Sequence, residues 1–455
     1  MARQMKDSGV EWIGEIPEEW EVARLKTRFF FGKGLPITKE NLVPAGVPVV
    51  SYGQVHSKSN NGTALSNELF RFVDESYLAT NPQSLVHRGD FIVADTSEDV
   101  EGCGNCVYVD SDLVLFAGYH TIILFDKEAR DNKYFAYLFQ SNEWRNQIRC
   151  KVSGVKVFSI SRKILSDAYC TVPPTAEQTA ISTYLDLKCA EIDKVVEQTR
   201  ATIEEYKKLK QAIITEAVTK GVRGPRPMKP SGVEWICDIP EEWMICSIKR
   251  GVSKVGSGKT PSGGAEVYLN EGVLFLRSQN IYDTGLLLDN ATYISESTDE
   301  EMSGTRVFAD DVLLNITGAS IGRCCVYPAD LPSANVNQHV CIIRTVNSIF
   351  TADYMHYFWI SFAGKTSIQL YQTGGNREGM SADAIKNTLI PLMDISEQQE
   401  IATFLDTKCA EIDRIIEKKE QLIEELGSYK KSLIYECVTG KREIKIHNYS
   451  QSAIC

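Results

Sequence analysis

Two short patterns in this chain resemble ligand-binding motifs, and each lacks a part that its chemistry requires. GSGKT at residues 256–260 resembles a phosphate-binding loop. Such a loop needs a glycine five positions before Gly258, where this chain has Ser253, and a helix directly after it. Pro261 and the following Gly263-Gly264 pair disfavour that helix. Nucleotide hydrolysis is therefore kept only as a minor hypothesis, which titration of the pure chain with nucleotide would test.

Cysteine spacing gives the second pattern, Cys103-Gly-Asn-Cys106. A zinc site of this type needs a second pair of ligands nearby, and none has suitable spacing. The thirteen cysteines are an odd number scattered through apolar and helical contexts, which indicates reduced thiols in a cytoplasmic protein. There is no H-E-x-x-H and no Asn-Pro-Pro-aromatic motif of amino-methyltransferases. We therefore expect neither a bound metal nor a catalytic residue.

The charge distribution is uneven. The formal net charge is −11 and the pI is about 5.3, which argues mildly against a nucleic-acid binder. Net charge is an average, however, and the stretch 144–163 (WRNQIRCKVSGVKVFSISRK) contains six basic residues and no acidic one. This stretch fits either a solvated surface or a contact with DNA. No apolar run reaches the length of a membrane helix, and the first residues contain no apolar signal region.

The elements that position the patterns described above are organised around a duplicated stretch of the chain. Residues 177–221 and 397–441 share the segments DLKCAEID and DTKCAEID with a shift of 220 (397 − 177). Both contain strong helix formers and no proline, and their apolar residues recur at heptad spacing, which predicts two long helices that pair. Each would span roughly 68 Å at 1.5 Å per residue. The predicted pairing residues are Leu185, Ile192, Val196, Ile203, Ile213, Leu405, Ile412, Ile416, Ile423 and Leu433.

The duplication extends over most of the chain. GVEWIGEIPEEW at 9–20 recurs as GVEWICDIPEEW at 232–243, and each copy precedes a divergent block with short β-like runs such as 47–50 and 273–276. The two tryptophans of each copy are expected to anchor the segment on an apolar surface. We therefore predict two α/β domains with an internal pseudo-twofold repeat, separated by two long antiparallel coiled-coil helices. The predicted boundaries are 1–174 and 231–392 for the domains, 175–221 and 393–441 for the helices, 222–230 for a linker and 442–455 for a tail.

The order of these features resembles the DNA-specificity subunit of type I restriction–modification systems over nearly the whole chain. Besides the tryptophan motifs and the helices, the resemblance lies in SGKTPS (257–262), LRSQNI (276–281), TGASIGRCCVYP (317–328), NQHVCIIR (337–344) and TGGNREGMS (373–381). The first block departs from this pattern, with DTSEDVEGCGNCVYV at 95–109 and KVSGVKVFS at 151–159.

The resemblance implies a function and a set of partners. Each domain would be a target-recognition domain that reads one half of a split site in double-stranded DNA. The subunit would not be catalytic; it would dock two methyltransferase subunits and two restriction (translocase) subunits. S-adenosylmethionine, ATP and Mg²⁺ would belong to those partners, and this chain would hold no cofactor of its own.

If the chain reads DNA as this resemblance implies, the residue types that recognise bases identify the candidate contact residues. Arginine and lysine suit guanine, whereas asparagine and glutamine suit adenine. The candidates of the second block are Arg277, Gln279, Asn280, Arg323, Thr373, Asn376 and Arg377. Those of the first block are Tyr52, Gln54, His56, Lys151 and Lys156. An ordinary loop role remains open for each of them. The alternative for the whole chain is a helical scaffold that docks proteins without reading DNA.

Overall fold

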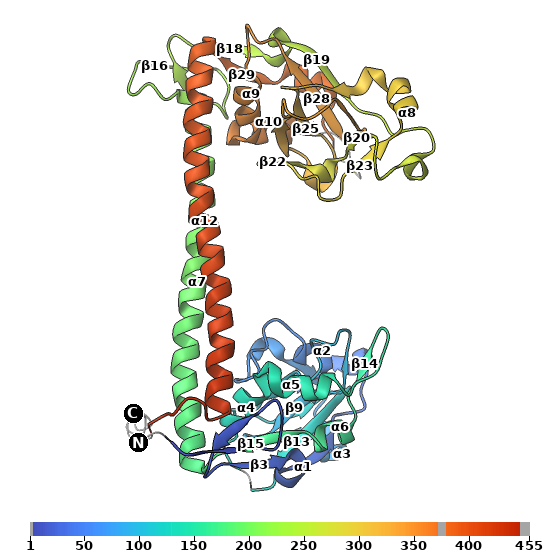
Figure 1. Cartoon of the computed structure of the whole chain (residues 1–455), viewed down its shortest axis with the longest axis vertical. Helices are drawn as coiled ribbons and strands as arrows, with labels where there is room; N and C mark the ends of the chain where they lie inside the picture. Colours follow the sequence, from blue (N-terminus) through green and yellow to red (C-terminus); the bar gives the residue numbers. More distant parts are fainter. Residues whose placement is uncertain (1–2, 129, 372–378, 446–455) are drawn as a thin grey trace. The chain divides into compact units, whose positions relative to one another are not determined.

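The computed structural model describes residues 3–128, 130–371 and 379–445, and it divides into two compact units (Figure 1). Unit 1 comprises residues 1–199 and 421–455, and unit 2 comprises residues 200–420. Each unit therefore contains one variable block and a part of each long helix. The sequence interpretation treated the helices as segments of their own, whereas in the structure each helix belongs partly to both units.

The two long helices are α7 (Thr175–Lys220) and α12 (Ile395–Val438). In unit 1, Lys430 Nζ lies 2.6 Å from Asp193 Oδ1, and Arg442 Nη1 donates to Tyr184 Oη at 3.0 Å. Residue numbers rise along α7 as they fall along α12, so the helices run antiparallel within this unit.

Unit 2 repeats this pairing. Lys210 Nζ lies 2.7 Å from Asp413 Oδ2, and these residues are the counterparts of Lys430 and Asp193 at the 220-residue shift (430 − 210 and 413 − 193). The same ion pair therefore forms once in each unit.

The heptad residues lie in these pairings. Ile192 is 8 % exposed, and Leu185, Ile203, Leu405, Ile412 and Leu433 are also buried. The other four predicted pairing residues, Val196, Ile213, Ile416 and Ile423, are half-buried. Burial of one aliphatic side chain contributes about 1.5–3 kcal/mol, so apolar packing dominates over the ion pairs in holding the helices together.

The block of unit 1 folds into two sheets. One has the strand order β11-β9-β13-β4 and the other β5-β7-β6-β12-β8, in which β6 and β12 are parallel neighbours. The bounds are β4 Phe29–Lys33, β5 Leu42–Val43, β6 Val47–Val50, β7 Arg71–Val73, β8 Leu85–Val86, β9 Phe91–Ala94, β11 Cys106–Tyr108, β12 Leu115–Ala117 and β13 Thr121–Asp126.

The block of unit 2 has the same strand order, except that its second sheet has four strands and no named strand equivalent to β5. Its sheets have the orders β26-β25-β28-β19 and β23-β20-β27-β24, and β20 and β27 are again parallel neighbours. The bounds are β19 Val252–Ser257, β20 Val273–Leu276, β23 Thr292–Ile294, β24 Arg306–Val307, β25 Val312–Asn315, β26 Cys324–Val326, β27 Ala334–Val336 and β28 Val340–Thr345. The strands predicted at 47–50 and 273–276 are confirmed.

Short elements complete the two units. The short helices are α1 Leu25–Arg28, α2 Tyr52–Val55, α3 Tyr77–Thr80, α4 Lys133–Gln140, α5 Asn142–Arg149, α6 Arg162–Ser166, α8 Glu296–Glu301, α9 Ala352–Ile360, α10 Phe362–Tyr371 and α11 Ala382–Asn387. The small antiparallel pairs are β1 Met5–Asp7 with β2 Glu15–Pro17, β10 Thr96–Ser97 with β14 Phe158–Ser159, β16 Met228–Pro230 with β17 Asp238–Pro240, and β21 Ile281–Tyr282 with β22 Gly285–Leu286.

Each block is entered and left through one two-stranded sheet. In unit 1, β3 (Glu21–Arg24) pairs with β15 (Tyr169–Val172). In unit 2, β18 (Met244–Ser247) pairs with β29 (Leu389–Leu392). The two blocks therefore join their helices through matching connections.

The tryptophan motif fixes the start of each long helix. In unit 1, Trp20 is fully buried and its Nε1 donates to Glu177 Oε2 at 2.8 Å, while Arg3 pairs with the same carboxylate at 2.7 Å. In unit 2, Trp243 Nε1 donates to Glu397 Oε2 at 3.0 Å, and Arg226 Nη2 lies 2.5 Å from Glu397 Oε1. The prediction that the motif anchors its segment by packing is confirmed for these two tryptophans.

The aromatic helices α4 and α9 attach the blocks to the long helices by repeated contacts. Tyr134 Oη donates to the carbonyl of Val438 at 2.8 Å in unit 1. Tyr354 Oη donates to the carbonyl of Val218 at 3.3 Å in unit 2. Burial raises the pKa of both phenols, so they remain donors.

A second tyrosine of each aromatic helix contacts a long-helix carboxylate. Tyr137 Oη donates to Asp186 at 2.5 Å, and Tyr357 Oη donates to Asp406 at 2.6 Å. Each block therefore contacts both long helices of its own unit.

Over the described part of the chain, no helix is sufficiently long and apolar to cross a membrane.

Candidate nucleic-acid interface

The candidates that follow the parallel strand pairs lie at equivalent places in the two units. After β6, Ser51 N donates to Gln54 Oε1 at 3.2 Å. After β20, Arg277 N donates to Asn280 Oδ1 at 2.9 Å. In both cases a side-chain amide three residues on closes the turn. The sequence therefore identified the same loop in both domains, although the residues differ.

Several of these candidates have their polar groups occupied by the fold. Asn280 is 2 % exposed, and its Nδ2 donates to the carbonyl of Leu287 at 2.9 Å. His56 Nε2 lies 2.8 Å from the carbonyl of Thr96, and its Nδ1 lies 3.1 Å from Asn105 Nδ2. A base contact by Asn280 or His56 is therefore not supported, because these groups shape the loops. Gln54 keeps its Nε2 group and one Oε1 lone pair for another partner.

Other candidates remain presented at the surface. Gln279 is exposed, and Tyr52 is half-buried. The guanidinium carbon of Arg277 lies 5.7 Å from the ring centroid of Tyr268, and that of Arg323 lies 4.5 Å from the ring centroid of Tyr282. An aromatic ring beneath a guanidinium orients it. The N–H groups point outward in the plane of the guanidinium and stay free to donate. Both arginines therefore stay predicted base or phosphate contacts.

The basic stretch of the first block divides into two parts. Arg145 points inward, where its Nε donates to the carbonyl of Phe139 at 2.8 Å and its Nη1 to Asn105 Oδ1 at 2.7 Å. Burial lowers the pKa of this arginine. Lys151 and Lys156 lie in the loop after α5 and are exposed, so they remain available for phosphate contacts. Thr373, Asn376 and Arg377 lie outside the described residues.

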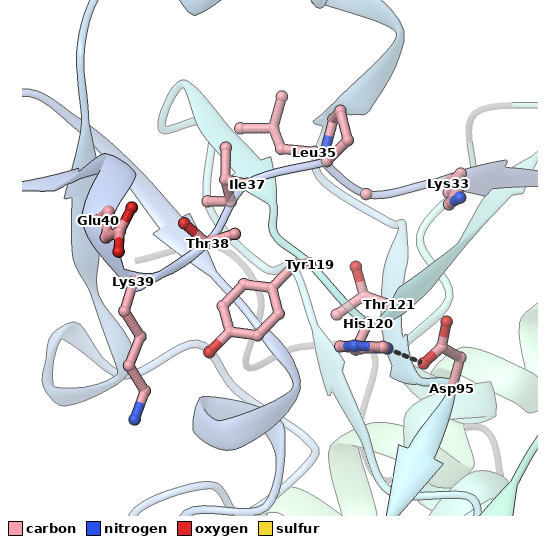
Figure 2. A pocket seen from close by; sticks show the side chains of 12 residues that line it. Lys33, Leu35, Ile37, Thr38, Lys39, Glu40, Asp95, Tyr119, His120 and Thr121 are labelled. Atoms are coloured by element: carbon pink, nitrogen blue, oxygen red, sulfur yellow. Dashed lines mark hydrogen bonds and ion pairs between the residues drawn. The ribbon is translucent and has the colours of Figure 1, made fainter.

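A loop that the sequence reasoning did not single out forms a cavity in unit 1. The segment 34–40 follows β4 and borders a cavity of about 680 Å³. Figure 2 shows Lys39, Tyr119 and His120 among the side chains that line this cavity. His120 Nδ1 lies 3.2 Å from Asp95 Oδ1. The lining combines Lys33 and Lys39 with Glu40 and Asp95, so its formal charges balance, and its lysine, histidine and tyrosine donors are suited to a phosphate or a base edge.

The corresponding loop of unit 2 contains the GSGKT pattern. Gly258 N donates to the carbonyl of Val340 at 3.0 Å, and Lys259 N donates to the carbonyl of Val336 at 3.1 Å. A Cβ on Gly258 would lie 1.9 Å from the Val336 carbonyl oxygen, so this glycine permits two segments to cross closely. The Gly258 and Lys259 amides, which a phosphate-binding loop would offer to phosphate, are therefore bonded within the fold, and no helix starts directly after them at residues 261–263.

The acidic segment of the first block borders a second cavity, of about 790 Å³. Glu98, Asp99 and Glu101 line it together with Arg145 and other residues. Arg149 and Lys431 also line it, so the three carboxylates are matched by three basic side chains. Cys103 lies in the same segment and is buried, and the described residues contain no group of ligands that could hold a metal.

The comparison with protein families gives one match in each half of the chain. The model of the type I restriction modification DNA specificity domain matches residues 17–205 and again residues 240–425. These ranges include both blocks and the larger part of both long helices. The family match is therefore duplicated in the same way as the structure.

Named relatives agree with this match. A putative type I restriction enzyme MjaX specificity subunit from Methanocaldococcus jannaschii is 23 % identical over 440 residues, which cover 95 % of this chain and 96 % of the relative. The type I restriction enzyme EcoBI specificity subunit from Escherichia coli is 24 % identical over 322 residues, 69 % of this chain and 67 % of the relative.

Two solved structures are similar in fold. A chain from a study of complex assembly and conformational transition of the type I R-M system has a TM-score of 0.71 at 14 % identity, covering 94 % of this chain and 99 % of that chain. The HsdS subunit from Thermoanaerobacter tengcongensis has a TM-score of 0.54 at 16 % identity, covering 94 % and 98 %. At these identities the likeness concerns the fold alone.

Proposed function

Because the chain belongs to the family of type I restriction modification DNA specificity domains, we propose that it reads a bipartite site in double-stranded DNA, one half with each unit. The observation that supports this proposal is a contrast within the repeat. The contacts between block and helix recur in both units, as with Tyr134 and Tyr354. The loops after the parallel strands differ, with Tyr52 in one unit and Arg277 near the same place in the other. A constant frame with different reading loops suits two different half-sites.

The surface chemistry supports DNA as the ligand despite the net charge of −11. Phosphate contacts fix the register on DNA, and base-edge contacts give sequence specificity. Lys151 and Lys156 are exposed for the first role in unit 1. Arg277 and Arg323 are available for either role in unit 2, where each stacks on a tyrosine.

The proposed partners follow from the family. The chain docks methyltransferase and restriction subunits, with two of each in the complete complex. It contributes no catalytic residue, and S-adenosylmethionine, ATP and Mg²⁺ are held by those partners. The scaffold alternative without DNA reading is not favoured, because the matching family is defined by DNA specificity.

One pair of measurements tests the proposal. Genome-wide mapping of methylated bases is compared in cells with and without this gene, both expressing the methyltransferase partner. A split motif that appears only with the gene is the expected result. In parallel, the purified complex should bind a duplex with that motif more tightly than a scrambled duplex, with affinity falling as salt rises. Equal binding to both duplexes at every salt concentration would refute DNA reading.

A further inference from the structure

A chain of hydrogen-bonded side chains ends at an exposed amide in unit 2. Thr317 Oγ1 lies 2.6 Å from His339 Nδ1, and Gln338 Nε2 lies 3.2 Å from His339 Nε2. The Thr260 hydroxyl bonds Gln338 Oε1 from the other side. Gln338 is exposed, whereas His339 is half-buried. An exposed glutamine is ordinarily free to rotate, but here both ends of its amide are held.

The segment that carries this amide is itself fixed. Asn337 is 9 % exposed; its N donates to the carbonyl of Leu276 at 3.0 Å, and its Oδ1 accepts from His339 N at 3.1 Å. Leu276 is the last residue of β20, and Arg277 follows it. Gln338 therefore lies beside the loop that already contains a predicted DNA contact.

The held amide keeps one donor and one acceptor for a further partner. A carboxamide has two N–H groups and two oxygen lone pairs. One N–H bonds His339, and one lone pair bonds the Thr260 hydroxyl. If the amide were turned by 180°, the oxygen would face His339 and the nitrogen would face Thr260. The same two groups, one N–H and one lone pair, would still be left free.

A free amide N–H beside a free carbonyl lone pair matches the major-groove edge of adenine, which offers the N7 acceptor beside the N6 amino donor. We propose that Gln338 is a specificity-determining residue that reads one adenine in the half-site of unit 2, and that His339, Thr317 and Thr260 are positioning residues for its amide. This inference rests on the proposed DNA-reading function. Pre-orientation of the amide removes the rotamer entropy that a free glutamine would lose on binding.

Unit 1 has different chemistry at the equivalent place. Asp95 N donates to the carbonyl of His120, as Ile316 N does to that of His339, so His120 and Tyr119 occupy the positions of His339 and Gln338. Figure 2 shows the Tyr119 ring beside the cavity and His120 paired with Asp95. A phenol cannot present a donor and an acceptor side by side to N6 and N7. Adenine reading by this site is therefore restricted to one half-site.

Base analogues test the inference on the full complex. The full chain is assembled with its methyltransferase partner on a duplex that carries the split motif, and each adenine is replaced in turn by 7-deazaadenine, which lacks the N7 acceptor. In the wild-type complex, one substitution in one half-site should weaken binding by no more than the roughly 5- to 150-fold range of a bidentate pair, because the analogue removes one of the two hydrogen bonds of the pair. Gln338→Ala should lose affinity in the same range on the natural duplex and be insensitive to that analogue.

Further variants separate base reading from general damage. Gln338→Glu keeps the size of the side chain but lacks the N–H, so it should show the same loss and a shift towards cytosine at that position. His339→Ala should give an intermediate loss at the same adenine and at no other. Asn347→Ala is the matched control, because Asn347 is an exposed amide beyond the opposite end of β28, and it should leave analogue sensitivity unchanged.

Three results would overturn the inference. The first is a Gln338→Ala complex with wild-type affinity and wild-type analogue sensitivity. The second is an equal loss on specific and scrambled duplexes, which would indicate a phosphate contact. The third is a unit 2 half-site without any adenine on either strand. A wild-type complex that does not distinguish the motif from scrambled DNA would instead refute the proposed function itself.

Discussion

Replacing Glu397 by alanine tests how the tryptophan motif holds unit 2 together. The Glu397 side chain is 1 % exposed, accepts the Trp243 indole N–H at 3.0 Å and pairs with Arg226 at 2.5 Å. The Arg226 side chain is 12 % exposed, and its guanidinium carbon lies 5.0 Å from the Trp243 ring centroid. Removing the carboxylate thus leaves a buried indole donor without its acceptor, whereas Arg226 keeps its ion pair with Glu242 at 2.7 Å and its hydrogen bond to the Lys220 carbonyl at 3.0 Å.

The expected loss follows from these two groups. An unsatisfied buried donor costs about 1–3 kcal/mol. Removing one partner of a buried ion pair costs about 3–5 kcal/mol. The second penalty does not apply in full, because Arg226 keeps Glu242 as a partner, so Glu397→Ala should lower the free energy of unfolding of unit 2 by about 1–3 kcal/mol, mainly through the unpaired indole.

Hydrogen exchange measured by mass spectrometry gives the loss separately for each unit. Peptides from residues 200–420 should exchange faster in Glu397→Ala, and peptides from residues 1–199 should not. Glu400→Ala is the matched control, because Glu400 lies one turn further along α12 and its ion pair with Arg223 is exposed. Similar exchange in the two variants, or equal acceleration in both units, would refute the reasoning.

Other predictions concern the helices and thiols. One heptad added to both helices, after Ile203 and after Ile423, lengthens each by ~10 Å; the gap in the methylated motif should grow by up to roughly three base pairs, and an unchanged gap with intact methylation would contradict this. Residues 1–230 alone should self-associate, because the α7 seam and its ion-pair residues recur in α12; a monomer in sedimentation would count against it. Burial raises the pKa of Cys189 and of Cys409 to about 11, so at pH 8 both thiols should resist alkylation until the chain unfolds; rapid labelling of the native chain would show that these thiols are accessible. The pure chain should show no methyltransferase, nuclease or ATPase turnover, and activity of a contaminant-free preparation would refute that expectation.

Most of the architecture could be predicted from the sequence, because the chain contains an internal repeat. The heptad spacing and the 220-residue shift predicted α7 and α12, and the short β-like runs predicted β6 and β20. These features depend on local periodicity, which a sequence displays directly. The division into units was not predicted, because it depends on which halves of two distant helices contact each block.

The candidate site was less predictable than the fold. Residue type alone suggested Asn280 as an adenine reader, yet its amide closes a turn. Gln338 was within a segment that resembles the family, but nothing local indicates that His339 and Thr260 hold its amide. These contacts join residues far apart in the chain, so only the folded arrangement reveals them.

The most direct test of the central claim, that each unit reads one half-site, exchanges one block for the other. Residues 21–172 are grafted in place of residues 244–392, with both junctions in the matching two-stranded sheets β3–β15 and β18–β29. The graft keeps the tyrosine contacts to the long helices, because Tyr134 and Tyr137 replace Tyr354 and Tyr357. Methylated bases are then mapped in cells that express the chimera with its methyltransferase partner. The account predicts a motif in which the half-site of unit 1 appears on both sides of the gap. A motif that retains the original second half-site would contradict it.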